Sequence, residues 1–454
     1  MTRMQKTFVI LVVAVLVVGL MFVGSRQTEK TQQAPVSQNG LQIETWKTGN
    51  GARVMYVHAP QLPMVDVRIV FDAGSARDGD TPGLASLTNS MLDQGAGEWD
   101  TNALAERFDS VGASFGSSTA RDMAMVQLRS LTDAALLDKA MDTLVAILQQ
   151  PHFKESELQR LRKQTLIALK NQQQSPSTIA SKAFFKALYG DHPYATPTIG
   201  TRESVSRLQR QDLLAFYKRY YVAENAVVAI VGDVDKAQAH QLVEKLLGKL
   251  PKGKHAEALP AATPLAQAER KLLAHPSSQT HILVGQLGMK RNDADYFTLY
   301  VGNHILGGSG FGSRIMEEIR EKRGLAYSSY SYFSPMRVEG PFVMGLQTRN
   351  DKRDEALALL DQTLRKFIEE GPTAEELEHA KKNITGGFPL RIDSNRDIVD
   401  YIAMIGFYDL PLDYLNTFNQ KVNAVTIEQI KDAFTRRIHP DRMLTVMVGK
   451  GVEE

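Results

Sequence analysis

The sequence predicts an α+β protein made of two related domains, and three observations support this prediction. Its 454 residues are too many for one ordinary hydrophobic core. Strand-like segments alternate with long amphipathic helices but lack regular βαβ punctuation, a pattern that favours helices packed on one face of a sheet. A helix–turn–strand segment near the middle of the chain also recurs near its end.

The first elements lie beyond an apolar amino terminus. Thr7–Gly24 is uncharged and follows Arg3 and Lys6, and as a helix it would extend about 27 Å, close to the roughly 30 Å of a bilayer core. We therefore expect a membrane anchor or signal segment at residues 1–25, followed by a polar linker at 26–40. An uncleaved signal-anchor, a cleaved signal and a soluble N-terminal helix are the alternatives. The preceding cations favour a chain that lies outside the cytoplasm.

The globular part begins at residue 41 with segments of clear periodicity. Strand-like alternation over Val65–Phe71 and Met123–Ser130 contrasts with helical spacing in the segments between and after them. The predicted helices are Ala103–Val111, Asp133–Leu148 and Glu155–Lys170.

The repeat joins Asp212–Gly232 to Ile430–Gly449, with Phe216 aligned on Phe434. Each copy reads as an amphipathic helix, a short turn and a buried strand that ends at glycine. A repeat unit of this length is too long for a solenoid, so it indicates two related domains.

The join between the domains is predicted in a segment that is poor in large apolar residues. Pro251–Leu265 (PKGKHAEALPAATPL) is rich in Pro, Ala and Lys. The predicted domains are residues 41–252 and 269–454, connected by a linker at 253–268.

Composition excludes several classes of function. The formal net charge of +2 gives no bulk field for nucleic acid or an acidic polymer. The absence of cysteine excludes disulfides, thiolate nucleophiles and Cys-based zinc sites.

Several long stretches, in order along the chain, carry a family resemblance. They are AGSARDGDTPGLASLTNSMLDQG, FDSVGASFGSSTARD and YGDHPYATPTIGTRESVSRL in the first half, and HILGGSGFGSRIMEEIREKRGLAYSSYSYF in the second. Through them the chain resembles the insulinase/pitrilysin family of zinc peptidases. The resemblance implies two homologous domains, each a mainly antiparallel sheet covered by helices, which together form half of a clam-shell. It also implies that extended peptide pairs with an edge strand within GASFGSSTARD.

Active members of that family carry His-x-x-Glu-His directly after Gly-Leu-Ala, with a third ligand, Glu, on a later helix. The corresponding positions here are Ser86, Asn89, Ser90 and, on the later helix, Ala168. Neutral Ser and Asn side chains bind zinc weakly, so we expect no metal or other cofactor on this chain. Ser86 and Ser90 are expected to be packing residues, because no His or Lys base lies nearby in the sequence.

The ten histidines do not form another zinc motif. His192, in YGDHPYATP, is expected to be structural, and His379, in EELEHAKK, is expected on a solvated helix face.

The second half keeps a different part of the family pattern. IREKRGLAY places Arg320 and Tyr327 at the spacing of the family's Arg/Tyr pair, and the resemblance implies that they bind substrate near the scissile bond. Arg can grip a carbonyl or a developing oxyanion, and the Tyr hydroxyl can donate to the same oxygen. The alternative is an exposed, salt-bridged helix end beside a packed Tyr.

Local signals frame this pair. Ser313 is expected to cap a helix that runs through Lys322, with Glu318 and Lys322 as an i,i+4 pair and Gly324 at its end. The preceding Gly307–Gly312 lacks the ending of a phosphate loop and is either a substrate-touching loop or a flexible turn.

These features predict a non-catalytic, substrate-binding subunit of a heteromeric zinc peptidase. The expected partners are a homologous subunit with His-x-x-Glu-His, which holds the zinc, and an unfolded peptide; no nucleic acid is expected. The N-terminal segment is expected to place the chain at the bacterial inner membrane facing the periplasm, or free in the periplasm if it is cleaved. The alternatives are a structural or peptide-binding protein without a role in catalysis, and an autonomous metallopeptidase with unrecognised ligands.

Overall fold

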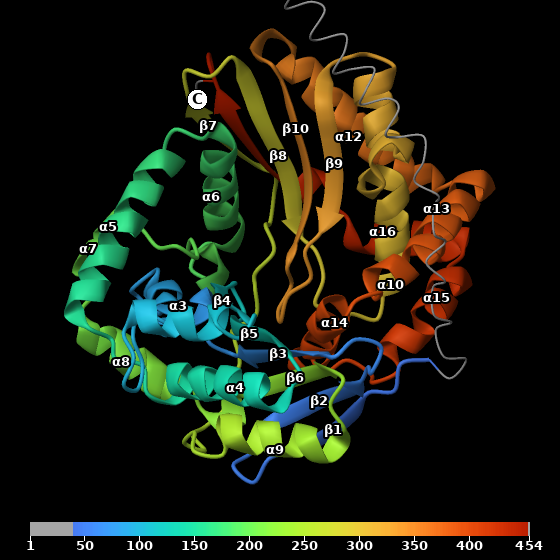
Figure 1. The fold of residues 1–454 in the computed structure, drawn as a ribbon. Helices are drawn as coiled ribbons and strands as arrows, with labels where there is room; N and C mark the ends of the chain where they lie inside the picture. The colour runs from blue at the N-terminus through green and yellow to red at the C-terminus, as the bar shows by residue number, and fades with distance from the viewer. Residues whose placement is uncertain (1–39, 453–454) are drawn as a thin grey trace, which may run out of the picture. The chain divides into compact units, whose positions relative to one another are not determined.

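The computed structural model describes residues 40–452. All elements below belong to one compact unit that begins at Gln42 (Figure 1). The predicted anchor or signal segment, and all of the polar linker except its last residue, lie outside the described residues. Within residues 40–452, no helix combines the length and apolar character needed to cross a bilayer.

The first half contains a six-stranded sheet in the order β1-β2-β6-β3-β5-β4. Only β2 and β6 pair in parallel, and the other pairs are antiparallel. The predicted edge strand is β4, which pairs on one side with β5. The strands are β1 (Glu44–Lys47), β2 (Arg53–His58), β3 (Met64–Phe71), β4 (Ser114–Thr119), β5 (Ala124–Leu131) and β6 (Ala226–Gly232).

The second half contains a five-stranded sheet in the order β7-β11-β8-β10-β9. Its one parallel pair is β7 with β11, and β11 also pairs antiparallel with β8. Because β6 has the same relation to β2 and β3, the two sheets share a topology, which fits two homologous halves. The strands are β7 (Glu269–Ala274), β8 (Gln279–Leu287), β9 (Ala326–Phe333), β10 (Pro341–Arg349) and β11 (Leu444–Gly449).

Helices cover these sheets, which confirms the predicted α+β class. The first half contributes α2 (Leu84–Met91), α3 (Thr101–Asp109), α4 (Ala134–Gln149), α5 (Glu155–Gln172), α6 (Pro176–Tyr189), α7 (Arg202–Arg207), α8 (Arg210–Tyr220) and α9 (Lys236–Leu247). The second contributes α10 (Tyr296–Asn303), α11 (Arg314–Met316), α12 (Arg353–Glu370), α13 (Ala374–Gly387), α14 (Asn395–Phe407), α15 (Tyr414–Ala424) and α16 (Ile427–Arg437). The predicted strands, helices and both repeat copies agree with β3, β5, α3, α4, α5, α8–β6 and α16–β11.

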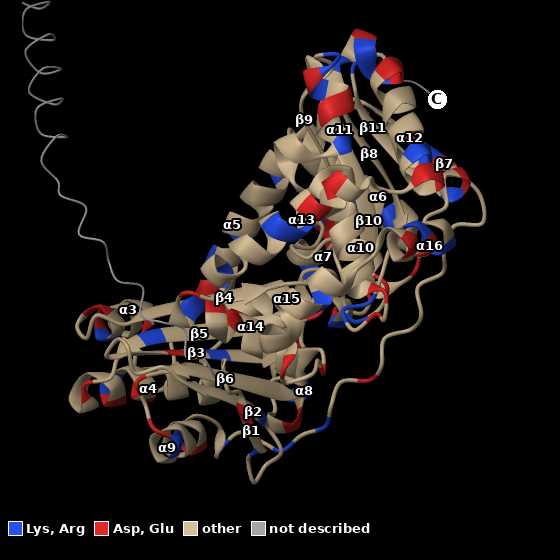
Figure 2. Cartoon of the chain, turned by 90° about the vertical axis from the view of Figure 1, so that its right-hand side faces the viewer, with Lys and Arg blue, Asp and Glu red and all other residues tan. Residues whose placement is uncertain are grey.

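Helix α4 shows how sequence sets these elements. The Asp133 carboxylate accepts hydrogen bonds from the backbone N–H of Ala135 and Leu136, which supplies partners for free donors at the helix start. One face, which includes Met141 and Leu144, is fully buried against the sheet. Charged residues gather mostly on helices and loops, whereas the strands are largely uncharged (Figure 2).

The two halves exchange helices across their boundary. Helix α6 of the first half packs on β8 and β11, and α14 of the second half packs on β3 and β6. Glycine permits both contacts, because a Cβ on Gly285 would lie 2.8 Å from the Phe184 ring and one on Gly406 would lie 2.7 Å from Val227. No helix or strand occurs between Leu247 and Glu269, and the domain boundaries stay a prediction.

Candidate substrate-binding site

Helix α2 carries the positions where active relatives hold zinc. It begins after Gly83, whose φ of 92° suits glycine, and the Asp78 carboxylate accepts from the backbone N–H of Gly83 and Ala85 at 2.7 Å each. Burial raises the pKa of Asp78 to about 7, although both hydrogen bonds oppose the rise. The helix start is thus held by a buried carboxyl group.

Asn89 occupies the position of the family's general base and works as a structural cross-link. Its side chain is buried, and Nδ2 donates to the Ser118 carbonyl of β4 at 2.9 Å. The Tyr221 hydroxyl donates to Asn89 Oδ1 at 2.9 Å. An amide can donate and accept at once, whereas a carboxylate cannot donate to the Ser118 carbonyl. This position therefore joins α2 to β4 and to the end of α8.

The other motif positions offer no metal ligand. Ser86 and Ser90 are half-buried on α2, which packs against α5, where Ala168 lies beside the exposed Ile167. Across residues 40–452, no group of three His, Asp or Glu side chains is placed to hold a metal ion.

The two singled-out histidines lie in different environments, each as expected. His192 is buried, with Nδ1 accepting from the Tyr194 N–H at 3.1 Å and Nε2 lying 3.0 Å from the Pro260 carbonyl oxygen. Burial is the main cause that lowers its pKa. His379 lies exposed on α13.

Arg320 and Tyr327 lie together in the second half. The Arg320 guanidinium carbon is 4.7 Å from the centroid of the Tyr327 ring and 4.4 Å from that of Phe311, so two aromatic rings flank the cation. Tyr327 is 75% exposed and Phe311 is 65% exposed, so the cluster is open to a ligand. Phe311 comes from the Gly307–Gly312 loop.

The acidic groups near Arg320 are occupied by other cations. Glu318 binds Lys322 and Arg323, each at 2.7 Å, which confirms the predicted Glu318–Lys322 pair. Glu317 binds Lys322 at 2.9 Å. In the described part of the chain the Arg320 guanidinium has no ion pair or hydrogen bond, although Glu317, Glu318 and Glu321 lie close to it in sequence.

The backbone here differs from the predicted regular helix. α11 passes at once into a π-helical turn at Glu317–Glu321, a type of turn that is frequent at functional sites. Ser313 occupies the N-cap position but makes no capping bond, so this prediction was wrong; its Oγ donates instead to the Gly310 carbonyl at 2.7 Å. Gly324, at φ 61°, follows the turn as expected.

Two further tyrosines extend this surface along β9, one of the two edge strands of the second sheet. Tyr330 and Tyr332 stack with ring centroids 5.9 Å apart and are 38% and 40% exposed. Tyr330 lies flat over β10 because Gly345 leaves room for it; a Cβ there would be 2.6 Å from the ring. Sequence reasoning missed both tyrosines and Phe311, although period-two tyrosines on one strand were a usable signal.

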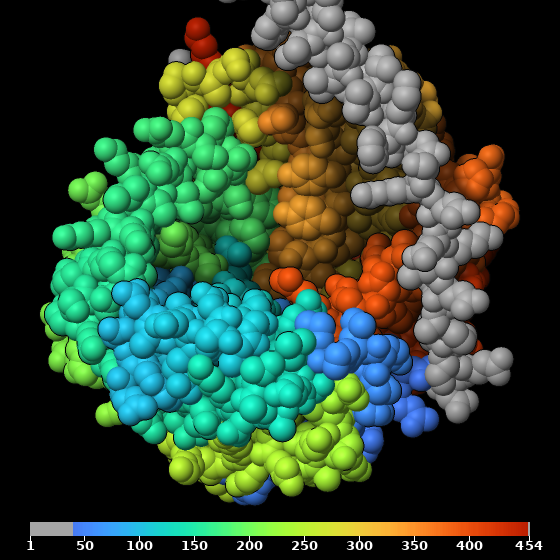
Figure 3. Space-filling view, viewed as in Figure 1, coloured from blue at the N-terminus to red at the C-terminus, as the bar shows by residue number. Residues whose placement is uncertain are grey.

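The structure does not bring the two groups of predicted residues into contact. α2 packs against α5, α8 and β4, whereas α11 and the π-helical turn pack against β9 and α12. A hollow opens between the green α5–α6 region, the cyan α3–α4 region and the orange β9–β10 region (Figure 3). The described residues thus offer an exposed Arg/Tyr cluster in the second half and, separately, a hollow between the elements named above, and they contain no cluster of side chains placed to hold a metal ion.

These features are those of a peptidase-like chain whose zinc-motif positions hold no His or Glu, and comparison with known proteins identifies its family. Residues 53–202 match the family model for insulinase (peptidase family M16), and residues 207–384 match that for the peptidase M16 inactive domain. The chain belongs to the insulinase (M16) family and is an inactive homologue within it.

Three relatives illustrate the similarity. The crystal structure of a peptidase M16 inactive domain from Pseudomonas fluorescens has a TM-score of 0.88 and 38% identity, covering 91% of this chain and 99% of that one. The non-peptidase homolog YmxG of Helicobacter pylori is 29% identical, covering 84% of this chain and 87% of its own length. The uncharacterized zinc protease YmxG of Bacillus subtilis is 25% identical, covering 90% and 99%.

Proposed function

We propose that this chain is the non-catalytic, substrate-binding subunit of a heteromeric zinc peptidase. The observation that carries the proposal is the Arg320 cluster: a cation flanked by two rings, without an ion pair or hydrogen bond among residues 40–452, beside an exposed tyrosine. A merely structural arginine at this place would be expected to bind one of the adjacent glutamates.

The zinc-motif positions on α2 have lost their metal ligands, whereas the Arg320/Tyr327 pair of the second half is retained. This difference supports a division of labour between two subunits. A homologous subunit with His-x-x-Glu-His would hold the zinc and activate water. This chain would close over it and supply Arg320 and Tyr327 to the carbonyl oxygen of the scissile bond, where negative charge develops. The hollow in Figure 3 would then form half of a chamber around an unfolded peptide.

The proposed location follows from the sequence of the amino terminus. Thr7–Gly24 would hold the pair at the inner membrane, facing the periplasm, and cleavage of this segment would release it into the periplasm.

Purification of the full-length chain from its native host tests the proposal. We expect a stable complex with a homologue that contains His-x-x-Glu-His, and peptide hydrolysis by the complex but by neither chain alone. Zinc should be found with the partner. Homodimers that are inert towards all peptides, or stoichiometric zinc in the isolated chain, would contradict the proposal.

A structural or peptide-binding role without catalysis remains the second candidate, favoured by the cation–ring contacts of Arg320, which could serve packing alone. In that case the complex would form, but its activity would not respond to changes at Arg320 or Tyr327.

A further inference from the structure

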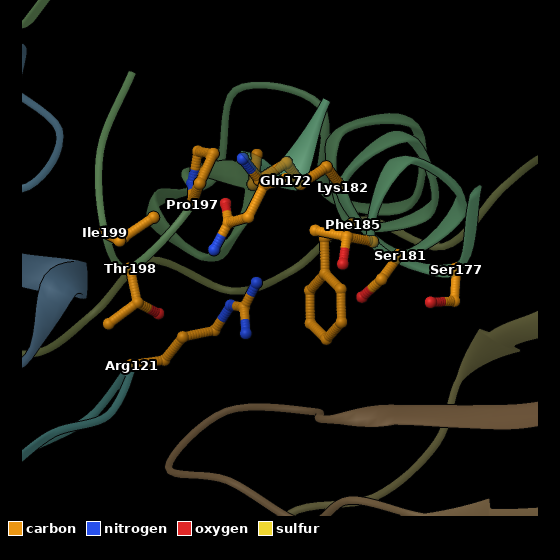
Figure 4. A pocket seen from close by; sticks show the side chains of 11 residues that line it. Arg121, Gln172, Ser177, Ser181, Lys182, Phe185, Pro197, Thr198 and Ile199 are labelled. Atoms are coloured by element: carbon orange, nitrogen blue, oxygen red, sulfur yellow. The ribbon is translucent and has the colours of Figure 1, made fainter. Parts of the chain in front are cut away.

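A pocket at the start of α6 is not explained by the Arg320 cluster. Its volume is about 380 Å³, and it lies between the end of α5, the first turns of α6 and the segment after η2 (Pro193–Ala195) (Figure 4). Its wall includes two cations, Arg121 and Lys182, and none of its lining residues is acidic. The pocket therefore has a positive potential.

Arg121 is held by a backbone carbonyl and an aromatic ring; Asp122, the next residue, attracts its charge but forms no ion pair with it in the described residues. Its Nε donates to the Tyr194 carbonyl at 3.0 Å, and its guanidinium lies 3.5 Å from the centroid of the Phe185 ring. Within the described chain the terminal guanidinium nitrogens make no hydrogen bond or ion pair, and Figure 4 shows the group lying between Thr198, Gln172 and Phe185. Burial lowers the pKa of Arg121, which reflects a cation removed from water.

Lys182 is also without an anion. Residues 40–452 provide no ion pair or hydrogen bond for its ammonium group, and burial lowers its pKa. Two partly desolvated cations without an ion-pair partner thus line one cavity, and an anionic ligand there would be attracted by both. The amino-terminal end of α6 adds favourable dipole potential.

Other groups in the pocket suit a peptide. Gln172 Oε1 is buried without a hydrogen-bond partner and could accept a backbone N–H. Ser177, Thr178 and Thr198 add hydroxyl groups to the wall.

The position of the pocket connects it to a strand-shaped site. Arg121 follows the end of β4, whose outer edge pairs with no other strand in the described chain. A peptide added to this edge would reach Arg121 as it left the sheet. The pocket is also close to β9. Burial raises the pKa of Tyr332 on that strand, and the positive charge of Arg121 opposes this rise, so Arg121 lies within electrostatic reach of Tyr332.

We infer that the Arg121–Lys182 pocket binds a carboxylate of an extended peptide, so that the substrates of this chain are acidic at one position. The carboxylate is supplied by an Asp or Glu side chain or by the peptide's C-terminus. This inference rests on the proposed function for its ligand class, and it concerns a part of the molecule remote in sequence from Arg320.

Peptide binding to the full-length chain tests the inference, with N-terminally labelled peptides followed by fluorescence anisotropy. One peptide has a central Glu and an amidated C-terminus, a second has Gln instead, and a third has Gln and a free C-terminal carboxylate. We expect the second to bind about tenfold more weakly than whichever carboxylate peptide matches the site.

Lys182→Gln should weaken binding of the matching carboxylate peptide by a similar factor. It should leave the affinity for the amidated Gln peptide unchanged, because the Lys182 charge and the peptide carboxylate form one interaction. Lys186→Gln is the matched control, since Lys186 lies on the same helix and its Nζ donates to the Gly190 carbonyl. Lys182→Glu should favour a peptide with central Lys. Circular dichroism and melting temperature establish that the variants fold.

Equal binding of all three peptides, or an unchanged affinity in Lys182→Gln, would overturn the inference. A second result would also overturn it. If the peptides bind equally with and without a carboxylate, and inorganic phosphate displaces them, the pocket is a site for free anions. The proposed function can fail separately from this inference. In that case acidic peptides still bind the isolated chain, but no active complex is found.

Discussion

At the scale of single residues, the position of the family's general base has a structural role in this chain. Asn89 occupies the position of the general base. Its amide nitrogen donates a hydrogen bond to the Ser118 carbonyl, and its amide oxygen accepts one from the Tyr221 hydroxyl. The buried Asp78 carboxyl group at the start of α2 likewise binds backbone N–H groups, those of Gly83 and Ala85. Restoring the motif would therefore disturb packing as well as change chemistry.

Asn89→Glu should lower the free energy of unfolding by about 3 kcal/mol, because a buried carboxylate would face the Ser118 carbonyl without a donor. Urea unfolding followed by circular dichroism measures the change. Ile167→Glu, on the exposed side of α5, is the control and should cost less than about 0.5 kcal/mol. Equal losses in the two variants would show that Asn89 is not a structural cross-link.

Arg320→Ala should reduce kcat of the proposed complex by about 10²-fold with a smaller change in KM, because the proposed contact to the scissile carbonyl oxygen would be strongest in the transition state. Tyr327→Phe should act in the same direction. Arg323→Ala is the control, since Arg323 is ion-paired with Glu318 and should leave kcat unchanged. A pure rise in KM would instead assign Arg320 to ground-state binding.

Asp78 gives the stability of the chain a pH dependence with a definite sign. Its folded pKa of about 7 exceeds that of an unfolded Asp, near 4, so between these values the unfolded chain releases a proton that the folded chain retains. The free energy of unfolding should therefore fall as pH rises from 5 to 7, by about 2 kcal/mol from this group. Urea titrations of wild type and Asp78→Asn at both pH values isolate it, since the variant lacks this contribution. A constant difference between the two proteins would refute the assignment.

At the scale of elements, the exchange of α6 and α14 ties the halves together. Asp122, at the end of β4, accepts hydrogen bonds from the Tyr408 hydroxyl and the Arg337 N–H, both at 2.9 Å, and also from Tyr194. Since Tyr408 and Arg337 belong to the second half, one buried carboxylate joins both. We expect the halves to unfold in one transition.

Gly406→Ala should destabilise the chain by about 1–3 kcal/mol, because its Cβ would lie within 3 Å of Val227 and Met55 on the first sheet. Gly386→Ala on α13 is the matched control. Its Cβ would meet nothing within 4 Å, so higher helix propensity should stabilise by up to about 1 kcal/mol. Differential scanning calorimetry measures both. Two separate transitions in Gly406→Ala with an unchanged second half would argue against interlocked halves.

At the scale of the whole molecule, sequence alone determined the α+β class, the duplicated architecture, the missing zinc ligands on α2 and the edge position of β4. The class and the duplication follow from periodicity and repetition along the chain, whereas the zinc-motif positions and the edge strand follow from the resemblance of the sequence to the insulinase family. The exchange of α6 and α14, the π-helical turn before Tyr327, the insertion of Phe311 against Arg320 and the Arg121–Lys182 pocket were decided only by the tertiary structure. Each of these features depends on which surfaces pack together and on which cations then remain without a partner. Residues far apart in the sequence carry no local signal that their side chains will be in contact.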